Sequence, residues 1–366
     1  MTYLCDLVWS NGALHRDQTV DIVDGKVTAL RPRLPFDTGK HLHLLMPGCT
    51  DLQVNGGGGV MLNSSPTADG LRQIAKGHRS KGTGWILPTV ITDAPEIMTA
   101  AVDAVLEVYP NEGILGLHIE GPHIAPKRRG THAERFIRPL DQATVEQVRR
   151  LRDRDIPVKL TLAPERSDPD LMRDLVAMGA ILSIGHSAAT GDQVQEALSL
   201  GTTCFTHLYN AMPPMTSREP GIVGTAICSD AYCGLIADGI HVSWEMARIA
   251  CASRPRPDRM FLVSDAMSTV GGPDHFELYG QTIHVKDGAL VNAEGSLAGA
   301  HIDMVTSLAN AHHHVGLPLE QALAMATDTP RALLGLPRQT LPGLSLSDLI
   351  ALTPDLTLTE MPDVAA

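Results

Sequence analysis

Four short apolar segments of the sequence each end in a side chain that can bind a metal or move a proton. These residues are Glu120 after LHI, His186 after SIG, His207 after CFT and Asp265 after LVS. Imidazole and carboxylate groups suit Zn²⁺, with Fe²⁺ as the alternative. Three such ligands leave one position open for water, as in catalytic rather than structural sites, and a separate carboxylate can serve as general base and acid. Each residue alone is weak support, because a histidine or aspartate at a strand end is more often a hydrogen-bonded or helix-capping residue.

These side chains can meet only if the strands that they follow lie parallel in one closed sheet. Apolar runs at 50–54, 85–89, 114–119, 158–162, 181–184, 203–206, 234–237 and 261–264 alternate with helical stretches such as 66–81, 141–153 and 191–200. Pro66 after two serines is typical of a helix start, and Gly82 of a helix end. Eight strand–helix repeats favour a (β/α)8 barrel over an open α/β sheet, which is the alternative. The strand ends of a barrel form its mouth, so we expect the four residues to converge there.

Both ends of the chain are strand-like. Asp24-Gly25 between two apolar runs is typical of a hairpin turn, and residues 349–352 and 356–358 flank Pro354-Asp355. We therefore expect an α/β protein in which a TIM-like (β/α)8 barrel spans residues 46–335. A small β-sandwich domain is expected from residues 1–45 together with 336–366.

The composition is that of an ordinary soluble protein with a large core. Of the 366 residues, 43% are hydrophobic and 19% are charged. The net charge of -12 disfavours nonspecific nucleic-acid binding but allows local binding of a small anion. No apolar run reaches the roughly 20 residues of a membrane helix, and the N-terminus does not resemble a signal peptide. The six cysteines form no C-x-x-C motif, so we expect reduced thiols and a cytoplasmic protein.

Several motifs near these strand ends are specific in combination. They are PGCTDLQVNG at 47–56, HIEGPH at 118–123, GTH at 130–132, HLYNAM at 207–212, REPG at 218–221 and ADGIH at 237–241. At these motifs, and over nearly the whole chain, the sequence resembles the N-acetylglucosamine-6-phosphate deacetylase family of the amidohydrolase superfamily. The resemblance implies hydrolysis of a linear amide, which converts N-acetyl-D-glucosamine 6-phosphate into D-glucosamine 6-phosphate and acetate.

The resemblance also implies roles for the strand-end residues. Glu120, His186 and His207 would hold one divalent metal per subunit, zinc in the first place or ferrous iron, and Asp265 would be the catalytic acid and base. Many amidohydrolases carry His-x-His after the first strand and hold a second metal there. Gln53 and Asn55 stand at those positions, and neutral amides are poor ligands for transition metals. We therefore expect a single metal.

The substrate contacts carry over from the same motifs. Asn210, Ala211, Arg218 and His241 would hold the phosphate, part of it across a homodimer interface. Thr131 and His132 would contact the sugar or the acetyl carbonyl, and Leu297, Ala298 and Gly299 the acetyl end. Alternatives are a solvated surface position for Arg218, a structural role for His241, and a turn-shaping role for Asp238, which is the favoured interpretation there. The basic run 127–129 would either attract an anion to the mouth or lie in a solvated loop.

Three other functions stay open. The same chemistry could act on a related sugar such as N-acetylgalactosamine 6-phosphate, since epimers differ only in small pocket details. The chain could be an amidohydrolase of cyclic amides or aminoacyl groups, which would not need Arg218 and His241. It could also be a catalytically silent barrel that serves as a binding module, although retention of all three ligand candidates and Asp265 argues against this.

Overall fold

The computed structural model describes residues 1–361 and centres on an eight-stranded parallel sheet. In sheet order, which is also chain order, the strands are β5 (Cys49–Val54), β8 (Thr83–Ile91), β9 (Leu117–Glu120), β10 (Val158–Leu162), β11 (Ile181–Ile184), β12 (Cys204–Phe205), β13 (Tyr232–Leu235) and β14 (Met260–Leu262). A parallel bridge between Val54 and Ala266 joins the first strand to the end of the last. The sheet is therefore a closed barrel, as predicted, and strands β10 and β11 have the predicted bounds.

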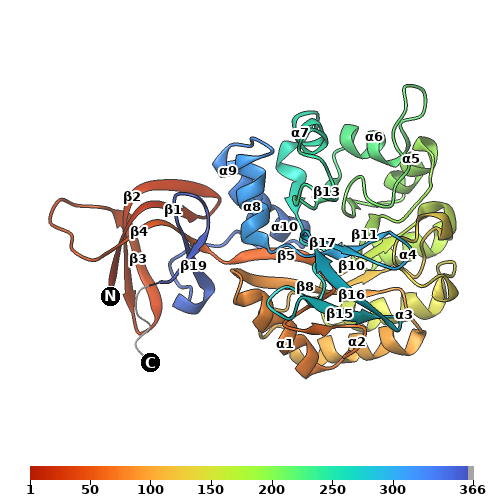
Figure 1. Cartoon of the computed structure of the whole chain (residues 1–366), viewed down its shortest axis with the longest axis horizontal. Helices are drawn as coiled ribbons and strands as arrows, with labels where there is room; N and C mark the ends of the chain where they lie inside the picture. Colours follow the sequence, from red (N-terminus) through yellow and green to blue (C-terminus); the bar gives the residue numbers. More distant parts are fainter. Residues whose placement is uncertain (362–366) are drawn as a thin grey trace.

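Helices follow the barrel strands and cover their outer side (Figure 1). They are α1 (Ala68–Arg79), α2 (Pro95–Val108), α3 (Gln142–Arg152), α4 (Pro169–Ala177), α5 (Gly191–Ser199), α6 (Gly221–Cys228), α7 (Trp244–Ala252), α8 (Met304–His313), α9 (Leu319–Ala326) and α10 (Asp328–Leu333). Side-chain caps explain several starts: Asp141 accepts from the Thr144 N–H before α3, and Thr190 forms a capping box with Gln193 before α5. Helix α1 starts later than predicted, because Thr67 is its cap and Pro66 lies outside it.

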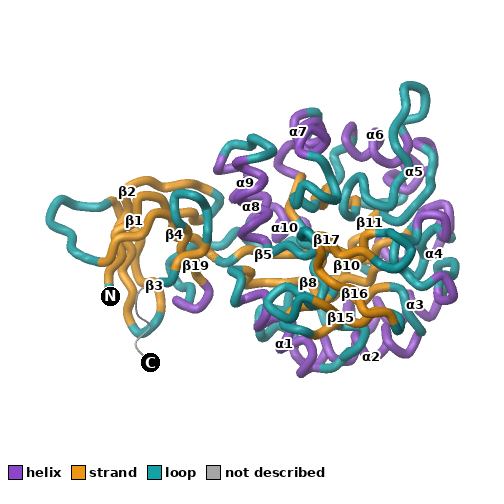
Figure 2. The backbone as a smooth tube through the Cα atoms, viewed as in Figure 1, coloured by secondary structure: helices purple, strands orange, loops and turns teal. Residues whose placement is uncertain are grey.

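The two chain ends form one six-stranded sheet at the opposite end of the molecule (Figure 2). Its order is β20 (Leu358–Thr359), β19 (Leu349–Leu352), β4 (Lys40–Pro47), β1 (Thr2–Ser10), β2 (Ala13–Val23) and β3 (Lys26–Pro32). The Val27 N–H donates to the Leu344 carbonyl at 2.9 Å, so the segment before β19 packs back on β3. Tyr3, Cys5 and Leu341 are fully buried in the resulting core. A small β-sandwich built from both termini was predicted, and the structure has a β-rich domain from both termini whose described strands form this one sheet. The predicted residues 362–366 lie outside the described part.

A four-stranded antiparallel sheet lies between β14 and α8 and was not predicted. Its strands are β15 (His275–Leu278), β16 (Gln281–Lys286), β17 (Ala289–Val291) and β18 (Leu297–Ala300). Figure 1 shows it in front of the barrel strands. Its inner side chains pack on Ile91 and Met267 at the barrel mouth, and the Tyr279 hydroxyl donates to the Thr92 carbonyl at 2.6 Å. This sheet therefore forms one wall of the mouth. Next to it lies a two-stranded ribbon formed by β6 (Gly56–Gly57) and β7 (Val60–Met61).

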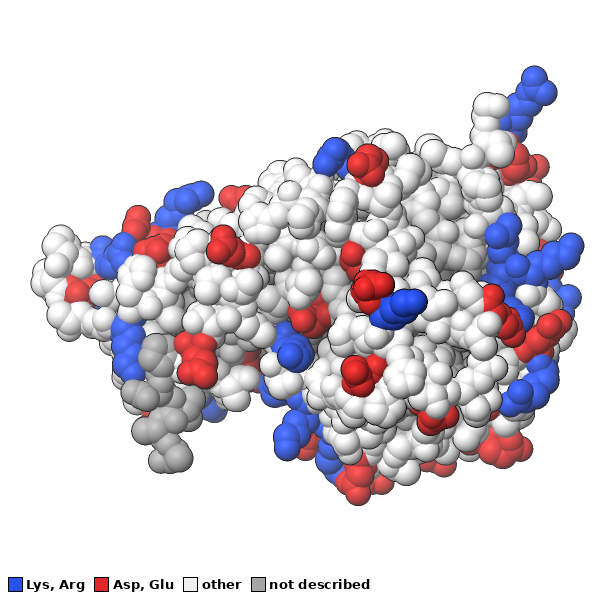
Figure 3. All heavy atoms as spheres, viewed as in Figure 1, with Lys and Arg blue, Asp and Glu red and all other residues white. Residues whose placement is uncertain are grey.

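The surface carries charges of both signs. On the face in Figure 3, acidic and basic side chains are interspersed. One loop before α6, residues 214–220, is exposed at every position and projects from the barrel (Figures 1 and 3). Within residues 1–361, none of the helices combines the length and the hydropathy that a membrane crossing demands.

Candidate active site

Glu120, His186 and His207 meet at the barrel mouth, as predicted from their positions at strand ends. Glu120 ends β9, and the two histidines follow β11 and β12 by two residues. The Nε2 atoms of His186 and His207 lie 3.0 Å apart, and they lie 3.3 and 3.1 Å from Oε1 of Glu120. All three side chains are buried. Although burial opposes it, hydrogen bonds from the two histidines lower the pKa of Glu120 well below its usual value.

This donor set fits a divalent metal. Ligand atoms held at about 2.0–2.1 Å in a tetrahedron lie about 3.3 Å from one another, close to the spacing found here. Two imidazole nitrogens 3.0 Å apart need a cation or a shared proton between them. Nδ1 of His186 lies 2.8 Å from the Arg128 carbonyl oxygen and therefore donates to it, which leaves the Nε2 lone pair for a metal. Zinc and ferrous iron both accept two imidazoles and a carboxylate.

A second combination, Glu120 with His132 and His186, also brings three ligand atoms within 4.8 Å of one another. We favour His207 over His132 as the third ligand because its contacts are shorter. His132 is also engaged on its other side, where Nδ1 lies 2.7 Å from the Thr92 hydroxyl. Burial, with a smaller effect from His186, lowers the pKa of His132 to about 3, so this imidazole is neutral.

Two side-chain amides hold Asp265 beside the three possible metal ligands. Nε2 of Gln53 donates to Oδ1 of Asp265 at 3.0 Å and to both oxygens of Glu120 at 3.1 and 3.2 Å. Nδ2 of Asn55 donates to the same Oδ1 at 2.8 Å. Gln53 and Asn55 thus act as hydrogen-bond donors to carboxylates. Burial and the nearby charge of Glu120 raise the pKa of Asp265.

The backbone is left-handed at three of the four strand-end residues. The φ angles are 47° at His186, 29° at His207 and 52° at Asp265. Residues other than glycine adopt this region rarely and at a cost of about 1–3 kcal/mol. Such outliers cluster at functional sites, where they aim side chains that a regular strand would turn elsewhere.

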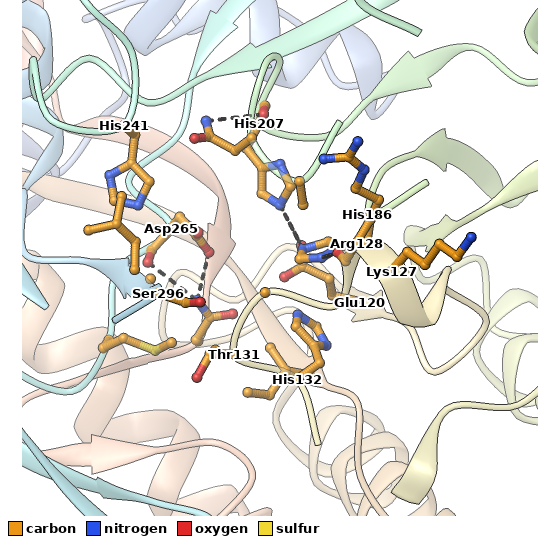
Figure 4. Close-up of a pocket in the computed structure, with 18 residues that line it drawn as sticks. Glu120, Lys127, Arg128, Thr131, His132, His186, His207, His241, Asp265 and Ser296 are labelled. Atoms are coloured by element: carbon orange, nitrogen blue, oxygen red, sulfur yellow. Dashed lines mark hydrogen bonds and ion pairs between the residues drawn. The ribbon is translucent and has the colours of Figure 1, made fainter. Parts of the chain in front are cut away.

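One cavity of about 360 Å³ contains this group (Figure 4). Its lining includes Glu120, His186 and His207 together with Asp265. Most of the predicted substrate contacts line it as well, namely Thr131, His132, Asn210, Ala211, His241, Leu297 and Gly299. In Figure 4, His241 and Asp265 lie across the cavity from His186 and Glu120, with Thr131 and His132 below them. The geometry therefore places three possible metal ligands, a separate carboxylate and polar donors around a space the size of a small ligand.

Two predicted contacts lie outside this lining. Ala298 is fully buried and packs in the core of the four-stranded sheet, whereas its neighbours Leu297 and Gly299 line the cavity, as expected from the alternation of faces along a strand. Arg218 lies in the exposed 214–220 loop and does not reach the cavity of its own chain.

Lys127 and Arg128, from the basic run noted in the sequence, lie in a loop at the mouth, where both line the cavity and Lys127 is exposed to solvent. Several other cavity residues escaped the sequence analysis. Ile91, Met267 and Ser296 line it as well. Thr92, which contacts His132, follows β8 directly, and the rule that selected the other strand-end residues would have found it.

Asp238 and His241 form one unit at the cavity edge. The Asp238 carboxylate lies 2.6 Å from Nδ1 of His241 and accepts the backbone N–H groups of Ile240 and His241. Asp238 therefore shapes its turn, as favoured from the sequence, and also orients the imidazole. Hydrogen bonds from His241 lower the pKa of Asp238 although burial opposes this.

A parallel barrel whose mouth gathers two imidazoles, a glutamate and a separate aspartate defines a metal-dependent hydrolase. The model of the amidohydrolase family matches residues 44–340. The chain therefore belongs to the amidohydrolase family.

Relatives with assigned activities are similar over most of the chain. N-acetylgalactosamine-6-phosphate deacetylase of Shewanella sp. (strain ANA-3) is 40% identical over 88% of this chain and 84% of its own length. N-acetylglucosamine-6-phosphate deacetylase of Haemophilus influenzae is 34% identical over 88% of this chain and 86% of its own.

Solved structures of deacetylases are also similar to this chain over nearly its whole length. The N-acetylglucosamine-6-phosphate deacetylase of Pasteurella multocida superposes with a TM-score of 0.87 at 32% identity, covering 98% of this chain and 97% of that one. A variant of the Mycobacterium smegmatis enzyme in complex with N-acetyl-D-glucosamine-6-phosphate superposes with a TM-score of 0.88 at 30% identity, covering 98% and 96%.

Proposed function

We propose that this protein hydrolyses the acetamide of N-acetyl-D-glucosamine 6-phosphate to D-glucosamine 6-phosphate and acetate. The observation that carries the proposal is the shared cavity, in which Glu120, His186 and His207 adjoin Asp265. The activities and the bound substrate of the similar proteins support the same assignment.

The chain's own residues divide the chemistry. A divalent metal held by Glu120, His186 and His207, zinc in our proposal, would supply Lewis acidity toward the acyl carbonyl and toward water. Asp265 takes a proton from the attacking water and returns it to the departing amine. Because Gln53 and Asn55 both donate to Oδ1, we assign this transfer to Oδ2.

His132 is placed to stabilise the oxyanion of the tetrahedral intermediate. The Thr92 hydroxyl lies 2.7 Å from Nδ1 of His132 and 3.4 Å from the Glu120 carbonyl oxygen, and we propose that it donates to the nearer nitrogen. The neutral imidazole then carries its proton on Nε2 and can donate it within the cavity. Fixed donors aimed at developing negative charge are among the strongest catalytic contributions in hydrolases.

The phosphate would bind on the HLYNAM loop. Tyr209 and Ala211 are left-handed, with φ of 78° and 52°, on either side of Asn210. The Asn210 N–H donates to the His207 carbonyl at 3.0 Å, so the N–H of Ala211 is the backbone donor that we assign to the phosphate. His241, oriented by Asp238, adds a further donor.

We further propose a homodimer in the cytoplasm. Arg218 of a second copy would then reach the phosphate, since the exposed 214–220 loop carries it away from its own cavity. A guanidinium binds phosphate through two parallel hydrogen bonds. The six unpaired cysteines suit a reducing compartment.

A second substrate is favoured by one observation. The Shewanella relative, at 40% identity, acts on N-acetylgalactosamine 6-phosphate. The chemistry and the site residues would be the same, and the epimeric hydroxyl alone would differ.

The deciding measurement is acetate release from both 6-phosphorylated epimers and from both unphosphorylated sugars, with metal content determined on the same sample. We expect release from a phosphorylated sugar only, with about one metal per subunit. Absence of release from all four with metal bound would overturn the substrate assignment. A metal-free preparation that no divalent ion activates would favour a silent binding module instead.

A further inference from the structure

Two histidines face each other across the exposed hairpin of β15 and β16. The hairpin turns at Tyr279 and Gly280, both left-handed at φ of 51° and 82°, and its register pairs His275 with His284. The Val285 N–H donates to the Asp274 carbonyl at 2.8 Å, so the histidines occupy the next, non-hydrogen-bonded pair. In antiparallel sheets facing side chains are closest at such pairs, and the two rings lie 5.4 Å apart between centroids.

Asp274 adds a carboxylate to this pair. Its Oδ1 lies 3.1 Å from Nδ1 of His275. One oxygen of Asp274 and one nitrogen of each imidazole all lie within 4.8 Å of one another. Within residues 1–361, groups of three His, Cys, Asp or Glu side chains with ligand atoms this close occur here and at the barrel mouth.

Other histidine clusters lack this arrangement. His41 and His43 both contact Asp6, but they contact different oxygens, and Nη1 of Arg33 lies 3.9 Å from that carboxylate. The rings of His312 and His313 at the end of α8 lie 4.9 Å apart, but Nδ1 of His312 is engaged by the Leu317 carbonyl oxygen at 2.8 Å and no carboxylate joins them among the close groups of the described residues. On the hairpin, Glu277 and Lys286 share the outer face with the histidine pair and are both exposed, so their charges offset each other.

We propose that Asp274, His275 and His284 form a second metal site, separate from the catalytic one, for a divalent transition ion such as Zn²⁺, Cu²⁺ or Ni²⁺. Two imidazoles and a carboxylate are the ligands that these ions accept. All three side chains are exposed, so binding carries little desolvation cost, and water completes the coordination. A bound ion cross-links β15 to β16 and so braces the sheet whose residue Leu297 lines the cavity.

The test uses the full chain with its catalytic metal in place. Zn²⁺ is titrated by calorimetry, and bound metal is counted after dialysis against a fixed free concentration. Wild type is expected to take up one ion beyond the catalytic one. The double variant His275→Gln with His284→Gln should lose this uptake or bind at least about tenfold more weakly, since even indirect supports of a ligand are worth about that much.

A matched control is His313→Gln, which removes an exposed histidine from α8. The control should keep the second ion, and all variants should keep deacetylation at one metal per subunit, because none of these residues lines the cavity. Hydrogen exchange in β15 and β16 should slow on adding Zn²⁺ in wild type and the control only. Equal uptake by wild type and the double variant, or equal loss in the control, would overturn the site.

Discussion

Thr92→Val removes the hydroxyl that contacts His132 from behind the cavity lining and tests whether that hydroxyl positions the imidazole. Valine keeps the branched shape of threonine, so packing changes little. Both Thr92 and His132 are buried, and Nδ1 of the imidazole makes its hydrogen bond of 2.7 Å with the Thr92 hydroxyl. The substitution therefore leaves a buried nitrogen without a partner.

The expected effect follows from that burial. An unpaired buried polar group costs about 1–3 kcal/mol of stability. Catalysis should suffer as well, because the tautomer that donates from Nε2 is no longer selected. Loss of a full oxyanion donor costs about 10²–10³ in kcat. Since the imidazole stays in place, we expect about a tenfold to hundredfold loss, or about 1.4–2.7 kcal/mol of transition-state stabilisation.

Steady-state acetate release on the metal-loaded protein, with chemical denaturation alongside, measures both effects. The loss should fall on kcat and leave KM nearly unchanged, because the phosphate binds elsewhere in the cavity. Thr92→Ser retains the hydroxyl and should retain most of the rate. Thr269→Val is the matched control, because the Thr269 hydroxyl lies 2.9 Å from Nδ1 of His301 outside the cavity. This variant should be less stable than wild type but should have an unchanged kcat. Normal kcat in Thr92→Val, or equal damage in Thr92→Ser, would refute the reasoning.

Three further predictions concern the carboxylates and the metal. Asp265→Asn should reduce kcat by about 10²–10⁴ with fold and metal content retained, measured by acetate release and metal analysis; a near-normal rate would exclude Asp265 as acid and base. Burial raises the pKa of Asp51 from 3.8 to about 7, so the folded-state pKa exceeds the unfolded one and stability is lost as pH rises toward and through 7. Urea denaturation of the metal-loaded proteins should show wild type losing on the order of 4 kcal/mol relative to Asp51→Asn between pH 4 and pH 8, and a pH-independent difference would contradict this. Chelation should abolish acetate release, and Zn²⁺ or Fe²⁺ should restore it; persistence of full activity after complete metal removal would rule out the ligand assignment.

The barrel and its metal group could be predicted because both depend on local patterns. The runs 158–162 and 181–184 end close to a proline or a glycine, namely Pro157, Pro164 and Gly185, and the predicted bounds match the strands. Parallel strands in one barrel bring their carboxyl ends to one mouth, so Glu120, His186 and His207 had to meet once the strand count was eight.

The parts that could not be predicted depend on tertiary contacts. Strands β15–β18 are three to six residues long, and their position against the barrel mouth follows from packing on Met267 and Ile91, not from local periodicity. The buried position of Ala298, outside the cavity lining, could not be predicted for the same reason, because the strand that turns it inward had not been predicted. The position of Lys127 in the cavity lining follows from the path of a loop, on which sequence periodicity carries no information.

The left-handed backbone at His186, His207 and Asp265 places folding and chemistry under opposing selection. Glycine at these positions would relieve local strain, and asparagine would tolerate the same conformation. A library of variants selected for expression and thermal resistance alone should therefore accumulate glycine and asparagine at all three positions and lose activity as it does so. The present side chains persist at the mouth only where turnover itself contributes to fitness.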